Sequence, residues 1–312
     1  MKKVGIIGGS GFIGSYITKT FLENDYQVKV SATDITREDK YQHLMNLKNA
    51  ENLYISELEI TDKEQLEDFV SDCDYVIHGG TPFILDFQDA ERELFEPTIN
   101  GTINFLEVIN KTPGIEKVVL IASVAGWNTN FPMPANGRDF YDTFDETHAR
   151  FTSKDSHPYA QAKFIANQVV EQFIKNNPRL SYEISTVSPV MVMGKALSNR
   201  EDSTSGGLQF LIKNKIAPDD FIQFLYDNDV PFAIVDVADV AQATFKVTTT
   251  KGLHGKDYLL SSETFKVSDV HLMLNHQEPK EKAQIVYKSD LAKNDLRMQF
   301  RTVKETLNNY NN

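Results

Sequence analysis

The chain has 312 residues, 41% of them apolar and 24% charged, with 16 Gly and 11 Pro, which excludes collagen-like, low-complexity and disordered chains. This length suits one large α/β domain or two modest domains with a buried core. Lys and Arg number 32 against 44 Asp and Glu, and the net charge of −12 makes nucleic acid and anionic membranes unfavourable partners.

Short aliphatic runs alternate with longer amphipathic stretches in the first half of the chain, a pattern typical of a parallel sheet with helices on both faces. After the first run, apolar residues recur at helical spacing from Phe12 to Phe21, and Asn24 ends that pattern. The segments that we expect to be strands are Lys3–Ile7, Gln27–Ser31, Leu53–Glu57, Tyr75–His78, Val118–Ala122, Glu183–Ser188 and Asp257–Leu260. The sequence therefore predicts a doubly wound α/β fold.

The alternation becomes less regular from about residue 190, where the polar stretch Ser198–Gly207 precedes short helical patterns. We therefore expect residues 1–190 to form the main domain and residues 191–312 to form mainly a smaller, substrate-binding lobe. The late strands Glu183–Ser188 and Asp257–Leu260 should nevertheless belong to the main sheet. The last helical pattern covers about Val303–Tyr310.

Cys73 is the single cysteine, so the sequence excludes an internal disulfide and a zinc site with several cysteines. The apolar stretch near the N-terminus is short and contains five glycines, unlike a signal peptide, and no run of about 18 apolar residues follows. We therefore expect a soluble, cytoplasmic protein.

A glycine-rich turn, GGSGFIG, joins the first predicted strand to the first predicted helix and satisfies both GxGxxG and GxxGxxG. Glycine is needed there because the turn requires positive φ and a close backbone approach to pyrophosphate, which the N–H groups of the helix N-terminus bind. The alternative is a tight turn without a ligand. The expected cofactor-binding residues of the turn are Gly8, Ser10, Gly11, Phe12, Ile13 and Gly14. This turn makes the predicted fold Rossmann-type, with residues 1–190 as the dinucleotide-binding domain.

The loop after the second predicted strand bears on the choice of dinucleotide. Asp34 lies about 20 residues after the turn, where an acid holds the ribose 2′-hydroxyl of NAD. Arg37 and Lys40 follow in the same loop and can hold the 2′-phosphate of NADP. For both bases the alternative is a solvated loop.

Tyr159 and Lys163 form a YxxxK pattern on a predicted amphipathic helix, and this spacing places both on one face. Because an unperturbed tyrosine has a pKa of about 10, its use as an acid or base at neutral pH needs a nearby cation, which Lys163 can supply. A packed tyrosine beside a snorkelling lysine is the alternative. Ser123 follows the strand Val118–Ala122, at the sheet edge where ligands bind, and can bond a reacting oxygen.

GGSGFIG, Ser123 and YAQAK, in this order and at these distances, resemble the extended short-chain dehydrogenase/reductase family, within the NAD-dependent epimerase/dehydratase superfamily. The resemblance spans nearly the whole chain. Within the family, the chain resembles more specifically the branch of dihydroflavonol reductases and aldehyde or ketone reductases. The stretches that support this branch are DYVIHGGTPF (74–83), EPTINGTINFLE (96–107), FDET (144–147), STVSPVMVMG (185–194), AIVDVADVAQA (233–243) and FRTVKETL (300–307).

This resemblance implies NAD(P)(H) binding and oxidoreductase chemistry on the carbonyl or hydroxyl group of a small molecule. Ser123 would orient the carbonyl and Tyr159 would donate the proton. Lys163 would bind the nicotinamide ribose and lower the pKa of the tyrosine. The resemblance also assigns cofactor contacts to Glu59 and Ile60 (adenine pocket), Gly79 and Gly80 (cofactor backbone) and Pro189 (nicotinamide), and further ones to Thr33, Thr81 and Val192. The alternative for Glu59 is a surface charge at the end of a strand, and the alternative for Pro189 is a strand terminator.

The chain departs from the family pattern at several positions. Ala122 stands where this branch usually has the first of two serines, so Ser123 alone keeps a hydroxyl. Thr33 stands where NADP-using relatives carry arginine, whereas Lys40 falls where a second phosphate-binding lysine is expected. NAD-using relatives place their acid at the position of Ala32, before Asp34. These positions favour NADP(H) and leave NAD(H) as the alternative cofactor.

We expect the segments Thr81–Gln88, Trp127–His157 and Met191–Gln223 to line the substrate cleft. They contain the large apolar residues Phe83, Phe87, Trp127, Phe131, Met191 and Met193, which favour an apolar carbonyl substrate. The alternative is that these side chains form local core.

Other functions on the same fold remain open. A nucleotide-sugar epimerase is one alternative, whereas a dehydratase usually adds an acid pair after the active serine, where this chain has Val124 and Ala125. A non-catalytic dinucleotide sensor is another, although it would normally lack the tyrosine or the lysine. We expect a monomer or a homodimer.

The histidines indicate no metal site. His148, His157, His254 and His271 show no metal-ligand spacing with one another. His78 follows a buried type of strand, and we expect it to be structural or next to the cofactor rather than a base.

Overall fold

The computed structural model describes residues 1–79, 88–135, 137–200 and 204–310. Within these residues, the main sheet has the strand order β3-β2-β1-β4-β5-β6-β9, and all neighbouring strands are parallel. Its strands are β1 (Lys3–Ile7), β2 (Gln27–Ala32), β3 (Leu53–Glu57), β4 (Tyr75–His78), β5 (Lys117–Ile121), β6 (Glu183–Pro189) and β9 (Asp257–Leu260). The strand order reverses between β1 and β4, which is where open α/β sheets bind ligands. The predicted doubly wound, Rossmann-type fold is confirmed.

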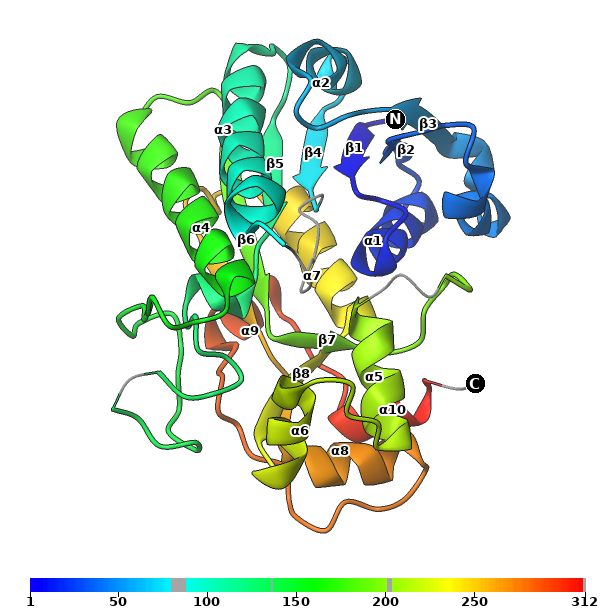
Figure 1. Cartoon of the computed structure of the whole chain (residues 1–312). Coiled ribbons are helices and arrows are strands. Elements are labelled where there is room, and N and C mark those ends of the chain that lie inside the picture. Colours follow the sequence, from blue (N-terminus) through cyan, green and yellow to red (C-terminus); the bar gives the residue numbers. More distant parts are fainter. Residues whose placement is uncertain (80–87, 136, 201–203, 311–312) are drawn as a thin grey trace.

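Helices cover both faces of this sheet (Figure 1). One face carries α2 (Lys63–Val70), α3 (Glu96–Lys111) and α4 (Pro158–Asn176), and the other carries α1 (Phe12–Glu23), α7 (Val237–Thr249) and α9 (Asp290–Leu296). Phe105 of α3 and Phe21 of α1 are fully buried, one in the core of each face. Burial of such apolar stripes against the sheet stabilises the three layers.

A smaller lobe packs at the carboxyl end of the main sheet (Figure 1). It contains a second sheet in the order β10-β8-β7, formed by β7 (Met191–Met193), β8 (Pro231–Asp236) and β10 (Glu263–Lys266). Around it lie α5 (Thr204–Asn214), α6 (Asp220–Asp227), α8 (Val267–Leu274) and α10 (Val303–Asn308). Since β9 pairs with β6, the chain leaves the lobe to complete the main sheet and then returns. The domain boundary near residue 190 stays a prediction.

The helices of the described residues include none long and apolar enough to cross a membrane. The predicted strand Val118–Ala122 lies one residue earlier in the structure, at Lys117–Ile121. This shift places Ser123 two residues beyond the strand, in the turn that follows it.

Candidate active site

The glycine-rich turn connects β1 to α1. Gly8 adopts a φ of +79°, in the left-handed region that favours glycine, and its carbonyl accepts a hydrogen bond from the Gly11 N–H at 3.1 Å. A Cβ on Gly14 would lie 2.0 Å from the Gly8 carbonyl oxygen, so only glycine lets the helix pack this closely on the turn. No described side chain caps the first turn of α1. Its N–H groups are therefore suited to an anion such as pyrophosphate.

The loop after β2 is exposed, and its charged side chains form hydrogen bonds and an ion pair within the loop. The Asp34 carboxylate accepts hydrogen bonds from the backbone N–H and the hydroxyl of Thr36, at 2.8 and 2.5 Å, and these bonds lower its pKa. The Arg37 guanidinium makes two bonds of 2.9 Å to Asp39. Thr33 lies exposed at the start of this loop. A nucleotide phosphate that bound Arg37 would have to compete with the Asp39 carboxylate.

Arg200 is a basic residue at this position that sequence reasoning missed. Its Nη1 donates to the carbonyl of Ser10 in the glycine-rich turn at 3.3 Å and to the carbonyl of Lys40 at 3.0 Å. The guanidinium therefore bridges the turn and the loop that are expected to hold the adenosine half of the cofactor. Arg200 lies 190 residues from Ser10 in the sequence. The one available signal was a basic residue within the polar stretch Ser198–Gly207.

The remaining predicted cofactor contacts follow the carboxyl ends of other strands. The Gly79 N–H, after β4, donates to the Ile7 carbonyl at 3.0 Å. Glu59 and Ile60 follow β3, the first exposed and the second packed against the hydrophobic core. Pro189 ends β6, and Val192 is buried in β7. Gly80 and Thr81 lie outside the described residues. The cofactor contacts of this set stay predictions.

Ser123, Tyr159 and Lys163 come together beyond the carboxyl ends of the parallel strands, where the glycine-rich turn also lies. Ser123 begins the short helix η5 (Val124–Gly126), and its hydroxyl accepts a hydrogen bond from the Ala125 N–H at 3.2 Å. Tyr159 lies in the first turn of α4, close enough to Ser123 for that hydroxyl to stabilise its phenolate form. The Lys163 Nζ lies 5.9 Å from the centroid of the Tyr159 ring. The structure thus brings together the three residues that the sequence assigned to catalysis.

Burial dominates the electrostatics of this group. It raises the pKa of Tyr159 above its ordinary value, and the hydrogen bond from Ser123 offsets part of that rise, so the phenol is protonated at neutral pH. Burial lowers the pKa of Lys163 to about 8. The net shift of the Tyr159 pKa is upward, and Ser123 rather than Lys163 is what lowers it here. A lowering of the tyrosine pKa by the lysine stays a prediction.

His78 ends β4 and is buried close to Lys163. Burial, aided by the lysine charge, lowers the pKa of His78 to about 4, so the imidazole is neutral at pH 7. Its ring packs edge-on against Phe105, with centroids 4.6 Å apart. Within the described part of the chain, Nε2 has no hydrogen-bond partner. These contacts agree with a structural role.

The residues predicted to line the substrate cleft differ in how deeply the structure buries them. Trp127 and Met193 are buried in hydrophobic cores, so the local-core alternative holds for these two. Phe131 and Met191 are only partly buried. Phe83 and Phe87 lie outside the described residues. No group of three or more His, Cys, Asp or Glu side chains in the described ranges is placed to hold a metal ion.

Comparisons with known proteins show the family of this chain. Residues 4–261 match the model of the NAD dependent epimerase/dehydratase family. Cinnamoyl-CoA reductase CAD2 from Medicago truncatula is 29% identical over 239 residues, which cover 76% of this chain and 69% of that protein. An anthocyanidin reductase from Vitis vinifera, (2S)-flavan-3-ol-forming, is 25% identical over 287 residues, or 89% of this chain and 81% of the relative.

Solved structures show the same fold. The yeast methylglyoxal/isovaleraldehyde reductase Gre2, complexed with NADPH, superposes with a TM-score of 0.78 at 23% identity and covers 98% of this chain and 96% of that one. Gre2 from Candida albicans, also in complex with NADPH, gives a TM-score of 0.81 at 21% identity, with 99% and 97% coverage.

Proposed function

The chain belongs to the NAD dependent epimerase/dehydratase family, and we propose that it is an NADP(H)-dependent oxidoreductase that reduces the carbonyl group of a small aldehyde or ketone. The observation that carries this proposal is that Ser123, Tyr159 and Lys163 lie together beyond the carboxyl end of β5, with the Lys163 Nζ 5.9 Å from the centroid of the Tyr159 ring. The relatives named above are reductases, which supports the same class of reaction.

The residues around the glycine-rich turn fit a dinucleotide phosphate. The uncapped start of α1 would bind the pyrophosphate, and the close packing of Gly8 and Gly14 makes room for it. The Arg200 guanidinium and the Lys40 ammonium would bind the 2′-phosphate of NADP(H); the bond from Arg200 to the Lys40 carbonyl, beside the glycine-rich turn, supports this assignment. Bound NADPH would supply the hydride for the reduction.

Tyr159 and Ser123 would act on the carbonyl oxygen. The phenol is protonated at neutral pH because burial raises its pKa, so Tyr159 can give its proton to the oxygen as negative charge develops there. The Ser123 hydroxyl would hold that oxygen through a hydrogen bond, which strengthens as the oxyanion forms. The Lys163 ammonium, with a pKa of about 8, is charged at neutral pH and would bind the ribose and stabilise the phenolate left behind.

The substrate is an apolar carbonyl compound in this proposal. Phe131 and Met191 keep part of their apolar surface accessible on segments expected at the cleft, which supports an aliphatic or aromatic substrate over a highly charged one. A small set of apolar and aromatic aldehydes and ketones is therefore the first screen, with a charged keto acid as the contrast.

Cofactor choice is tested first, by calorimetric titration of nucleotide-stripped protein with NADPH and, separately, with NADH. Tighter binding of NADPH, followed by carbonyl-dependent consumption of NADPH, supports the proposal. Binding of neither nucleotide would reject it. Tighter binding of NADH would assign the ribose to Asp34 and favour sugar epimerisation or alcohol oxidation instead.

We place the protein in the reducing cytoplasm because its single cysteine, Cys73, is buried and forms no disulfide. Monomer and homodimer both stay predictions, and light scattering of the purified protein distinguishes them.

A further inference from the structure

Asp257, the first residue of β9, pairs with Thr186 of β6, and its carboxylate accepts hydrogen bonds from three side chains. Its side chain is 11% exposed. Oδ1 accepts the Ser188 hydroxyl at 2.6 Å, whereas Oδ2 accepts the Asn167 amide at 3.1 Å and the Arg150 guanidinium at 3.2 Å. These donors come from β6, α4 and the loop before α4. A buried carboxylate with several donors is a strong local anchor, because its charge-assisted bonds cannot be replaced by water.

Arg150 extends this anchor to the turn that carries Ser123. While one nitrogen binds Asp257, Nη1 donates to the Gly126 carbonyl at 3.1 Å, and Gly126 ends η5. The guanidinium also stacks on the Trp127 ring, 4.1 Å from its centroid. The Nη2 that binds Asp257 also pairs with Glu171 of α4 at 2.5 Å, a carboxylate that is 52% exposed.

Asn167 extends the same anchor to the helix that carries Tyr159 and Lys163. It lies four residues after Lys163 and eight after Tyr159, so the three side chains share one face of α4. Its amide also packs directly under η5, because a Cβ on Gly126 would lie 3.3 Å from Nδ2. The two segments that present Ser123 and Tyr159 therefore meet at Gly126 and Asn167. Asp257 binds Asn167 directly and reaches Gly126 through Arg150.

We infer that Asp257 is a positioning residue for the Ser123–Tyr159 pair: through Arg150 and Asn167 it fixes η5 against α4 at the separation that lets both hydroxyls reach one carbonyl oxygen. The inference rests on the proposed reductase function and names a residue that touches neither substrate nor cofactor. Its physical basis is that hydrogen bonds weaken steeply with misalignment, and a displacement of about 1 Å in a catalytic group can reduce the rate by about 10²-fold.

The test begins with Asp257→Asn, which keeps the shape of the side chain and removes its charge. We expect kcat for carbonyl reduction to fall about tenfold or more, while the Kd for NADPH changes by less than about twofold. The matched control is Glu171→Gln, which removes the exposed partner of the same arginine and should leave kcat unchanged. The exchange Asn167→Asp with Asp257→Asn keeps one carboxylate and one amide in the contact between α4 and β9 and should restore most of kcat. An unchanged kcat in folded Asp257→Asn would overturn the inference.

A double-mutant cycle separates positioning from general destabilisation. If Asp257 acts through Ser123, Asp257→Asn should slow the Ser123→Ala variant much less than it slows the wild-type protein. Losses that multiply independently would show a merely structural role and would overturn the inference. Should Asp257→Asn not fold, Arg150→Lys takes its place in the cycle, because lysine keeps the charge but lacks the two-sided reach to Gly126 and Asp257.

Hydrogen exchange gives a readout that does not depend on turnover. In folded Asp257→Asn, amides of residues 123–127 should exchange faster than in wild type and in Glu171→Gln, because η5 has lost its anchor. Exchange equal to wild type would overturn the inference even if no carbonyl substrate is found. Absence of any turnover in the wild-type protein would count against the proposed function alone.

Discussion

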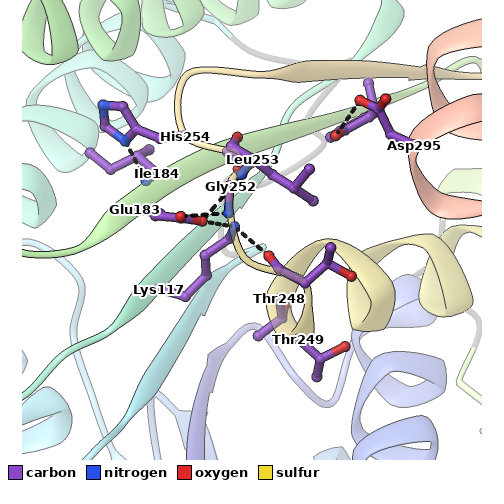
Figure 2. Close-up of polar contacts among 12 residues, drawn as sticks. Lys117, Glu183, Ile184, Thr248, Thr249, Gly252, Leu253, His254 and Asp295 are labelled. Carbon is purple, nitrogen blue, oxygen red and sulfur yellow. Dashed lines mark hydrogen bonds and ion pairs between the residues drawn. The ribbon is translucent and has the colours of Figure 1, made fainter.

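Lys117 of β5 and Glu183 of β6 form an ion pair at the end of the sheet opposite the proposed active site, with Nζ 2.5 Å from Oε2 (Figure 2). The lysine side chain is only 4% exposed, and its Nζ also donates to the Thr250 carbonyl, just past the end of α7, at 3.1 Å. Glu183 in turn accepts the Gly252 N–H at 2.7 Å. The pair therefore joins two strands to the end of α7, whose dipole favours a cation there.

Lys117→Met should destabilise the fold by about 3 kcal/mol, because it leaves the Glu183 carboxylate and the Thr250 carbonyl without their buried donor. Urea denaturation at pH 7 measures the change in the free energy of unfolding. The matched control is Lys63→Met, since Lys63 pairs with Glu107 through side chains that are 49% and 48% exposed and should contribute less than about 1 kcal/mol. Equal losses in the two variants would contradict the prediction.

Tyr159→Phe should reduce turnover by about 10²-fold or more and leave NADPH affinity nearly intact, because it removes only the proposed proton donor. Steady-state kinetics and calorimetry measure the two quantities. Tyr182→Phe is the control: this hydroxyl is buried at the start of β6, far from the site, and has no hydrogen-bond partner among the described residues. Turnover that is equal in both variants would remove Tyr159 from the mechanism.

The pH dependence of reduction should reflect Lys163. Since burial lowers its pKa to about 8, kcat/KM should be level near pH 6–7 and fall as pH rises through about 8, where the ammonium loses its charge. Lys163→Arg keeps a cation at all these pH values, so its kcat/KM, although lower, should not fall near pH 8. Persistence of the fall in this variant would assign it to another group.

Arg200→Ala should weaken NADPH binding about tenfold and change NADH binding little, if the guanidinium that bridges Ser10 and Lys40 also reaches the 2′-phosphate. Calorimetric titration of both nucleotides provides the comparison. Arg179→Ala, which removes an exposed arginine elsewhere, controls for net charge. An equal loss for NADH and NADPH would show that Arg200 supports the turn rather than selecting the phosphate.

His78 should make the protein sensitive to acid. The pKa of His78 is about 4 in the folded state and about 6.5 in the unfolded state. Its neutral ring therefore contributes fully to the stability of the fold above pH 6.5. As the pH falls towards 4, the unfolded state binds a proton that the folded state does not, and this stability is lost. The free energy of unfolding should therefore drop by about 3 kcal/mol more in wild type than in His78→Asn between pH 7 and pH 4. Urea titrations at both pH values test this, and parallel losses would show that His78 is not the responsible group.

Local patterns were enough to predict the main sheet. The bounds of β1, β3, β4 and β9 agree with those expected, because each is a short apolar run between turn residues. In contrast, β8 was missed because Asp236 both ends the strand and caps α7, accepting the Ala238 N–H at 2.7 Å. The strand pattern therefore passes into a helical one without a turn between them.

The residues of the candidate site that stand in a recognisable sequence motif could be predicted. Those that reach the site only through long-range packing could not. Ser123 and Tyr159 each stand in a recognisable local context, so their meeting could be expected from the topology. Arg200 and Asp257 could not be found in this way, because the segments that each one binds lie at least 69 residues away in the chain. Such contacts follow from the return of β9 to β6 and from the packing of the lobe, which no local pattern encodes.

The late position of β9 also sets an order of events during synthesis. A ribosome that has translated the glycine-rich turn, Ser123 and Tyr159 must still make the first part of the smaller lobe, from β7 to β8, before it reaches Asp257, and only then can the main sheet gain its edge strand beside β6. A nascent chain halted before that point would contain each proposed catalytic side chain but not the last strand of the sheet. Assembly of the working enzyme is thus deferred until most of the chain has left the ribosome.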